Sequence, residues 1–160
     1  MSEIVKVVGT IKLGGKELEV YSSLDEPVFK ASDIATMLDY SAGNVWNLLG
    51  MCEEDEKLLL TMVVAGQRRQ VSFVTERGLY DILEQSRKPL ARKWRRVIND
   101  ELITLRKARN LNILERFEEW GHELDNLYFD EDTGIIMESV TVAGGDVEQV
   151  PYRGELGGCI

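Results

Sequence analysis

The chain has 160 residues, of which 44% are hydrophobic and 29% charged, and its formal net charge is −9. This composition predicts one folded domain, or one domain with an appendage, and excludes a wholly disordered chain. Because no run of about 18 apolar residues is present, we expect no membrane span and no membrane partner. The two cysteines, Cys52 and Cys159, suit neither a disulfide framework nor a zinc site, so a reducing cytoplasm is the expected location.

The first 51 residues predict a hairpin followed by short helices. Apolar and polar residues alternate over 4–21 on both sides of Gly14-Gly15, which is typical of a β-hairpin. Val28-Phe29 indicates a further short strand. Ser32 is the expected N-cap of the next helix, and Ser41 that of a second helix. Trp46 and Trp94 occupy apolar helical faces, so we expect core packing for both, with base stacking as the alternative.

The middle of the chain predicts a second hairpin and two more helices. The segments KLLLTMVV and RRQVSFV flank a turn at residues 65–67, and the acidic residues 53–56 before them are expected in a solvated loop or at a helix start. Thr75 is the expected cap of a helix whose Leu79, Ile82 and Leu83 point inward. Pro89 fits the first turn of a long helix. Its apolar stripe consists of Leu90, Trp94, Val97, Ile98, Leu102 and Leu105.

Beyond residue 109 the pattern predicts more helix and then strands. No proline interrupts the chain to about Leu127, so the long helix can continue, although Gly121 weakens it. An apolar seam with spacings of 4, 3, 4 and 3 residues favours a protein interface with a partner helix, such as that of a homodimer. An intramolecular contact with the C-terminal hairpin explains its Trp120 equally well. The members of the seam are Ile113, Phe117, Trp120, Leu124 and Leu127. A C-terminal hairpin around Gly144-Gly145 and a flexible tail over residues 153–160 are expected to follow.

The charge lies in blocks. Residues 1–65 and 110–160 carry net charges of −6 and −10, whereas 12 basic and 5 acidic side chains give residues 66–109 a charge of +7. The run SRKPLARKWRRV, residues 86–97, holds six basic residues and no acid. It predicts a phosphate-binding face, extended by two arginines of the second hairpin turn. The candidate nucleic-acid-binding residues are Arg68, Arg69, Arg87, Lys88, Arg92, Lys93, Arg95 and Arg96. The alternative is a solvated face paired with the acidic flanks.

The sequence offers no catalytic constellation. His122 has neither a cluster of further metal ligands nor an oriented nucleophile beside it. The acidic turn at residues 130–134 lacks the spacing of a calcium-binding loop, and no glycine pair belongs to a phosphate-binding loop motif. We therefore predict no catalytic residue, no metal, no cofactor and no enzymatic activity, and we expect His122 to be exposed.

Three stretches resemble the BRO-N domain, the N-terminal module of baculovirus repeated-ORF proteins and phage antirepressors. They are VFKASDIATMLDY at residues 28–40, the segment from Val71 to Leu102 with its Glu-Arg-Gly-Leu-Tyr motif and basic helix, and LRK at residues 105–107. The resemblance covers about residues 4–109. It implies a small α+β viral or phage domain that binds nucleic acid without catalysis. The Leu-Pro pair frequent in the family is absent at residues 102–105.

The sequence thus predicts an α+β chain with three parts. Residues 1–109 form a BRO-N-like domain of β-hairpins and short helices, residues 110–128 a helical extension with the dimer seam, and residues 129–160 a C-terminal β-hairpin and tail. The leading functional hypothesis is a phage or viral regulator of the antirepressor type that binds double-stranded DNA in the host cell. The alternative is a phage protein that binds and inhibits a host protein, from defence, transcription or repression, through its acidic C-terminal surface. A viral protein is a further candidate partner. The acids of this surface are Glu115, Glu118, Glu119, Glu123, Asp125, Asp130, Glu131 and Asp132.

Overall fold

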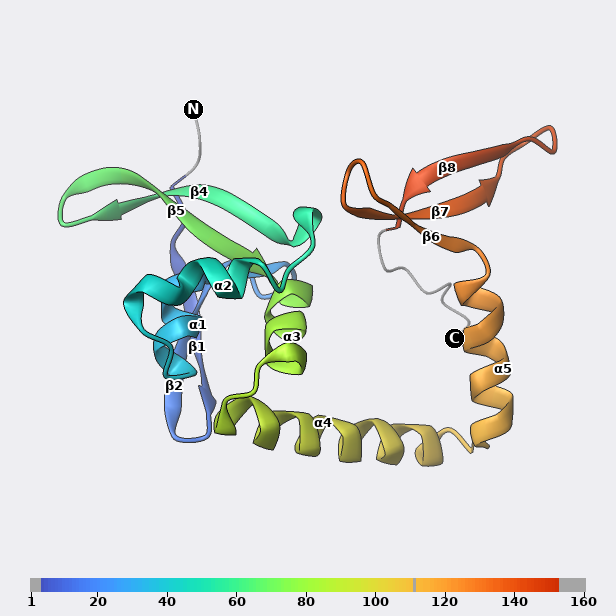
Figure 1. The fold of residues 1–160 in the computed structure, drawn as a ribbon, viewed down its shortest axis with the longest axis horizontal. Helices are drawn as coiled ribbons and strands as arrows, with labels where there is room; N and C mark the ends of the chain where they lie inside the picture. Colours follow the sequence, from blue (N-terminus) through green and yellow to red (C-terminus); the bar gives the residue numbers. More distant parts are fainter. Residues whose placement is uncertain (1–3, 111, 153–160) are drawn as a thin grey trace. The chain divides into compact units, whose positions relative to one another are not determined.

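The computed structural model describes residues 4–110 and 112–152, with the backbone alone at Glu123. The expected tail at 153–160, with Cys159, lies outside the described residues. The chain is α+β, as predicted, and forms two compact units, Met1–Asp100 and Glu101–Ile160 (Figure 1). In the described part of the chain, no helix is long and apolar enough to cross a membrane.

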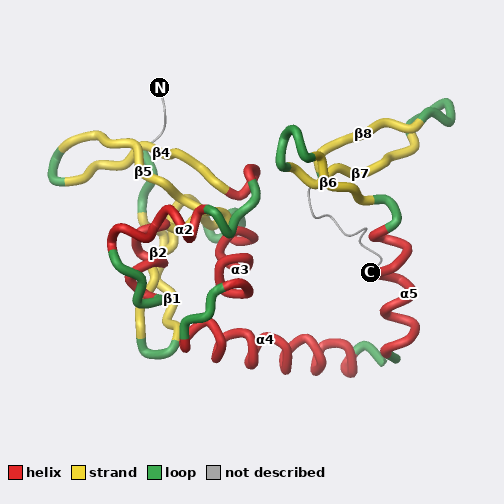
Figure 2. The backbone as a smooth tube through the Cα atoms, viewed as in Figure 1, coloured by secondary structure: helices red, strands yellow, loops and turns green. Residues whose placement is uncertain are grey.

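The N-terminal unit is built on one antiparallel five-stranded sheet (Figure 2). Its strands are β1 (Val7–Leu13), β2 (Lys16–Ser22), β3 (Pro27–Lys30), β4 (Lys57–Val64) and β5 (Gln67–Thr75). They lie in the order β1-β2-β3-β5-β4. Val5, two residues before β1, contacts β4 at the other edge of the sheet, because its amide donates to the Thr61 carbonyl at 3.0 Å. The two outer strands therefore approach each other at one end of the sheet.

Both predicted hairpins of this unit are confirmed. Leu13 pairs with Lys16 across Gly14-Gly15, whose φ angles of 56° and 81° favour glycine. Val64 pairs with Gln67 across a second two-residue turn with positive φ at both central positions. Turns of this kind match the twist of the flanking strands and fix their register.

Helices connect and cover the strands. They are α1 (Ala31–Met37), the 3₁₀ turn η1 (Ala42–Asn44), α2 (Val45–Leu49), the 3₁₀ turn η2 (Glu54–Glu56), α3 (Glu76–Gln85) and α4 (Pro89–Ala108). The Thr75 cap is confirmed, since its hydroxyl accepts a hydrogen bond from the Gly78 amide at 3.2 Å. The Ser32 cap is wrong, because α1 begins one residue earlier and Lys30 stands at the N-cap position without a side-chain bond. Strand β3 runs directly into α1 and leaves no room for a capping loop.

The core of the N-terminal unit lies on both faces of the sheet. One cluster joins the sheet to α1, α2, α3 and the start of α4, with Ile34, Leu48, Ile82 and Ala91 fully buried. The second cluster, on other strand residues, contains Tyr21, Val28 and Phe73. Alternating strand residues supply the two clusters, as the two-residue period of a strand requires.

The predicted continuation of the long helix to about Leu127 is wrong. Helix α4 ends at Ala108, and α5 (Ile113–Leu124) begins after a short break. Asn110 has a φ of +55°, a conformation that asparagine tolerates better than most residues. The Asn112 side chain accepts a hydrogen bond from the Glu115 amide at 2.8 Å and so caps the start of α5. Two asparagines end one helix and start the next without a proline.

The rest of the C-terminal unit is a three-stranded antiparallel sheet with the order β6-β7-β8. Its strands are β6 (Leu127–Asp130), β7 (Ile135–Thr141) and β8 (Val147–Pro151). The predicted hairpin around Gly144-Gly145 is confirmed as β7 and β8. Strand β6 was not predicted from the sequence. Leu127 begins this strand, so its predicted place on the helical seam is wrong.

Candidate nucleic-acid interface

The basic run lies at the junction of α3 and α4 and along the first half of α4. One side of this helix is anchored to the N-terminal unit. Ala91 is fully buried, and the Trp94 ring stacks on Tyr80 with ring centroids 5.7 Å apart. Leu90 packs so closely against the first hairpin turn that a Cβ on Gly14 would come within 2.3 Å of its Cδ1. These contacts hold the start of α4 on the folded core.

Arg95 belongs to this anchored side. Its Nη1 donates to the main-chain carbonyls of Leu83, Glu84 and Ser86 at 2.7, 2.9 and 2.7 Å. These carbonyls lie at the C-terminal end of α3, where a helix leaves its last carbonyls without partners. The positive charge also complements the helix dipole at that end. This part of the guanidinium therefore serves the fold, so we leave Arg95 out of the candidate face.

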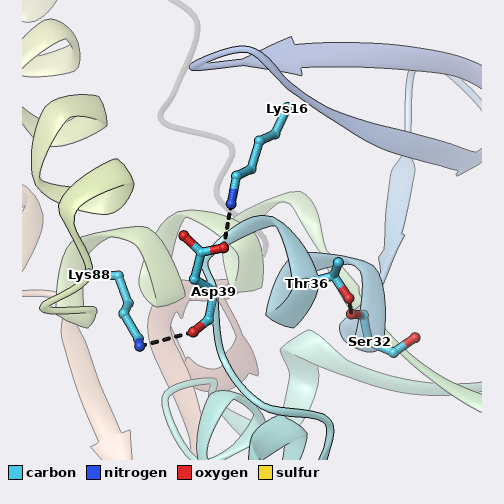
Figure 3. A network of polar contacts seen from close by, with 5 residues as sticks. All are labelled: Lys16, Ser32, Thr36, Asp39 and Lys88. Atoms are coloured by element: carbon cyan, nitrogen blue, oxygen red, sulfur yellow. Dashed lines mark hydrogen bonds and ion pairs between the residues drawn. The ribbon is translucent and has the colours of Figure 1, made fainter.

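Lys88 is likewise engaged at a corner of the N-terminal unit. Its ammonium donates to the Asp39 carbonyl at 3.0 Å and lies 4.8 Å from the centre of the Tyr40 ring. Figure 3 shows Asp39 between Lys88 and Lys16, whose ammonium is 2.5 Å from the Asp39 carboxylate. The hydrogen bond from Lys16 holds the pKa of that carboxyl below its usual range. Two lysines thus fix the turn that leads from α1 to α2.

Four cations of the run point into solvent. The side chains of Arg87, Arg92, Lys93 and Arg96 are exposed. The side chains of these four residues form no hydrogen bond or ion pair within the part of the chain that the structure describes. At 100° per residue, Arg92 and Arg96 lie roughly 40° apart around α4, and Lys93 lies roughly 60° from Arg96. Arg92, Lys93 and Arg96 on the helix, together with Arg87 in the connection just before it, are named the α4 basic face.

Arg68 and Arg69 do not join this face. Both lie on β5 close to its turn with β4, where their side chains are exposed, and Arg69 donates to the Gln67 side chain at 3.3 Å. Figure 1 draws the tip of the β4–β5 hairpin and helix α4 on opposite sides of the N-terminal unit. The hairpin is therefore a separate positively charged site. The single basic surface predicted from the sequence is divided between α4 and this hairpin.

A sequence model of the BRO family, N-terminal domain, matches residues 17–104, which is more than half of the chain. The chain belongs to the BRO family. No curated protein and no solved structure matches it. The Bro-N match runs from β2 to the second half of α4 and includes the α4 basic face, Lys88 and Arg95. Helix α5 and the sheet of the C-terminal unit lie beyond it.

The structure corrects the predicted burial of Trp46. The expectation of core packing is wrong, since this side chain is 80% exposed on α2. The five-residue helix buries only Leu48, so its apolar pattern is too short to define which face points inward. Trp94, the other member of the pair, is half-buried, as its stacking on Tyr80 requires.

The acidic segment at residues 53–56 starts the 3₁₀ turn η2, in agreement with the expected helix start, but it is only partly solvated. Glu56 is 2% exposed, and one of its carboxylate oxygens accepts from the Glu53 amide at 2.9 Å, while the other has no partner within the described structure. Burial and the neighbouring Asp81 carboxyl raise the pKa of Glu56 to about 7. Reciprocal capping of Glu53 and Glu56 accounts for their closeness.

The described part of the chain offers few groups for metal binding or nucleophilic chemistry. Oxygens of Glu53, Asp55 and Glu56 lie within 4.8 Å of one another and make up the one group of potential metal ligands found there. Burial raises the pKa of the Cys52 thiol to about 12, which disfavours the nucleophilic thiolate. His122 is exposed, as expected.

The predicted protein interface is also exposed. Ile113, Phe117 and Leu124 are each more than half exposed, and Trp120 is 39% exposed. The Phe117 and Trp120 rings meet edge to face at 5.2 Å, and the Arg116 guanidinium lies 4.9 Å from the centre of the Trp120 ring. Helix α5 therefore presents one apolar seam, without Leu127.

Proposed function

We propose that this Bro-N protein is a phage or viral regulator of the antirepressor type that binds double-stranded DNA and has no catalytic activity. It would act in the cytoplasm of the infected cell. The proposal rests on one observation above all, namely four exposed cations whose side chains have no partner in the described structure, three of them on a helix that is fixed to the core and Arg87 just before that helix. Family membership supports it, because the basic helix lies inside the matched Bro-N segment.

The α4 basic face suits phosphate groups. A guanidinium offers two parallel donors to a phosphate, and Arg92 and Arg96 are separated by a rise of about 6 Å along the helix. Because Leu90, Ala91, Trp94 and Arg95 anchor the helix, little ordering entropy is lost when its cations engage DNA. Such contacts supply affinity and salt dependence, whereas contacts with base edges supply sequence preference.

The acidic remainder of the chain limits non-specific binding. The basic block can still attract DNA, because charges more than about 8 Å apart are largely screened at physiological salt. Repulsion from a protein of net charge −9 nevertheless lowers the affinity for any polyanion. We propose Arg68 and Arg69 as a second, weaker contact that touches DNA separately from α4.

Neutralisation of matched pairs tests the proposal. Fluorescence anisotropy with labelled duplex DNA would compare the parent with Arg92→Gln/Arg96→Gln and with Arg68→Gln/Arg69→Gln. Both variants lose two positive charges, so the overall charge effect is equal. We expect the α4 pair to weaken binding about tenfold or more, and the hairpin pair to weaken it less. Equal affinity of the parent and the α4 pair would contradict the proposal.

The alternative is inhibition of a host protein through the acidic surface. It draws support from the exposure of Glu115, Glu118, Glu131 and Asp132. Asp130 is less suited to it, because its carboxylate accepts from the Asp132 amide at 2.9 Å within the β6–β7 turn. Parent protein that fails to bind DNA even at low salt would favour this second function.

A further inference from the structure

The outer end of the β4–β5 hairpin is a free two-stranded ribbon. Strand β3 pairs with β5 only at residues 73–75, so the first part of β5 pairs with β4 alone. In the described structure, the outermost backbone bond between the hairpin and another segment is the one from Val5 to Thr61. Three residues of β4 lie beyond Thr61 and extend roughly 10 Å before the turn. Figure 1 draws this end, residues 62–69, projecting from the N-terminal unit, and it is named the free ribbon.

The free ribbon is basic, although the chain is acidic. Residues 57–75, which include both strands and their turn, hold three basic side chains and no acid, whereas the net charge of the chain is −9. Residues 65–70 are all exposed. Among them, Arg68 and Arg69 form no ion pair with an acidic side chain of the described structure. A polyanion is the complementary partner of such an element.

The two arginines point to opposite faces of the free ribbon. Successive side chains of a strand alternate between its faces, so Arg68 and Arg69 do not share one. Arg69 donates to the Gln67 side chain at 3.3 Å, which places these two side chains on the same face. A flat partner that covers either face therefore meets a single arginine. Only a partner with negative charge on both sides of the ribbon meets both arginines.

We propose that the free ribbon enters the major groove of DNA with its tip first. The walls of a groove are the phosphates of the two strands, so Arg68 faces one wall and Arg69 the other. The major groove is about 12 Å wide and about 8.5 Å deep and admits a two-stranded ribbon, whereas the minor groove is only about 6 Å wide. The length of the free ribbon, roughly 10 Å, suits the depth of the major groove.

The tip of the free ribbon suits the floor of the groove. Ala65 and Gly66 form the turn, and neither has a bulky side chain that would keep the backbone away from the bases. Gln67 follows the turn, and its amide matches the donor and the acceptor that adenine presents in the major groove. This mode of binding rests on the DNA binding proposed above. It assigns sequence preference to the hairpin and most of the affinity to α4.

Salt titration of single variants distinguishes insertion from a flat contact. The Arg92→Gln/Arg96→Gln protein is the background, so that α4 does not mask the hairpin, and fluorescence anisotropy follows duplex binding. Arg68→Gln and Arg69→Gln should each make the slope of log affinity against log salt concentration shallower by about 0.9, because each arginine neutralises one phosphate. A change in only one variant, or in neither, would overturn the insertion. Loss of all duplex binding in the background, while the parent binds, would overturn it too.

Substituted duplexes test the base contact in the same background. Replacement of adenine by 7-deazaadenine removes an acceptor from the major groove and should weaken binding about threefold or more. Gln67→Ala should abolish this difference. Gln70→Ala should retain it and is the matched control, because Gln70 is an exposed glutamine paired with Thr61 at the base of the free ribbon. Equal affinity for the two duplexes, or the same response of both variants, would overturn the major-groove contact.

The parent protein separates this mode of binding from the function on which it rests. A parent that binds duplex DNA while the hairpin variants give the contrary results above would overturn the insertion alone. A parent that binds no duplex even at low salt would contradict the proposed function, and the insertion with it.

Discussion

Arg95 closes the C-terminal end of α3 by donating to the Ser86 carbonyl at 2.7 Å, and it reaches the Leu83 carbonyl with the same nitrogen. The sequence placed Arg95 among phosphate-binding residues, one position before Arg96. The helix turns by 100° between them, so Arg96 faces solvent while Arg95 faces the preceding helix. The most basic part of the chain therefore has both a structural and an exposed side.

This division predicts effects of different size on stability for two similar substitutions. Arg95→Met should lower the free energy of unfolding by about 1–3 kcal/mol, because carbonyls at the end of α3 lose a charged donor. Arg92→Met should change it by no more than about 0.5 kcal/mol, since its side chain is exposed. Urea unfolding followed by circular dichroism measures both. Equal stability of the two variants would show that the Arg95 contacts contribute nothing.

The two tryptophans of the N-terminal unit should also differ. Trp94→Ala removes a ring stacked on Tyr80 and should cost about 2–4 kcal/mol of stability. Trp46→Ala removes a side chain that is 80% exposed and should cost less than about 0.5 kcal/mol. Thermal unfolding gives the comparison. A large loss in the Trp46 variant would mean that α2 packs differently.

Glu56 predicts a pH dependence of stability. Burial raises its pKa to about 7 in the folded protein, above the ordinary value of 4.5, so the folded state binds the proton more tightly than the unfolded state. Its contribution to stability is therefore full below pH 4.5 and is lost as the pH rises to about 7. Glu56→Gln keeps an acceptor for the Glu53 amide and does not titrate.

The measurement is the difference in unfolding free energy between Glu56→Gln and the parent at several pH values. We expect the variant to gain on the parent as the pH rises from 5 to 7, and the difference to level off above pH 7. A difference that is constant over this range would show that Glu56 is ionised in the folded protein even at pH 5.

Local patterns predicted the elements that depend on neighbouring residues. The Gly14-Gly15 turn and the Thr75 cap are set by the backbone preferences of a few adjacent residues, and both are confirmed. The basic helix after Pro89 was predicted in the same way, from periodicity over many residues. Family resemblance gave the Bro-N assignment, which no periodicity provides.

The errors arise where distant contacts decide the outcome. Only the folded core determines that α2 turns Leu48 inward and Trp46 outward. Glu56 is buried because α3 packs on it, with the Gly78 backbone so close that a Cβ there would lie 3.2 Å from the Glu56 Cβ. Asn110 and Asn112 are the local signal for the break between α4 and α5, whereas the prediction relied on the absence of proline and on Gly121, which lies inside α5.

The α4 basic face is the central claim, and the salt dependence of DNA binding tests it most directly. The slope of log affinity against log salt concentration counts the phosphates that a protein neutralises, at about 0.9 per contact. Duplex binding by the parent should weaken steeply with salt, and Arg92→Gln/Arg96→Gln should make the slope shallower by about 1.8. Equal slopes for the parent and this variant would contradict phosphate binding by α4.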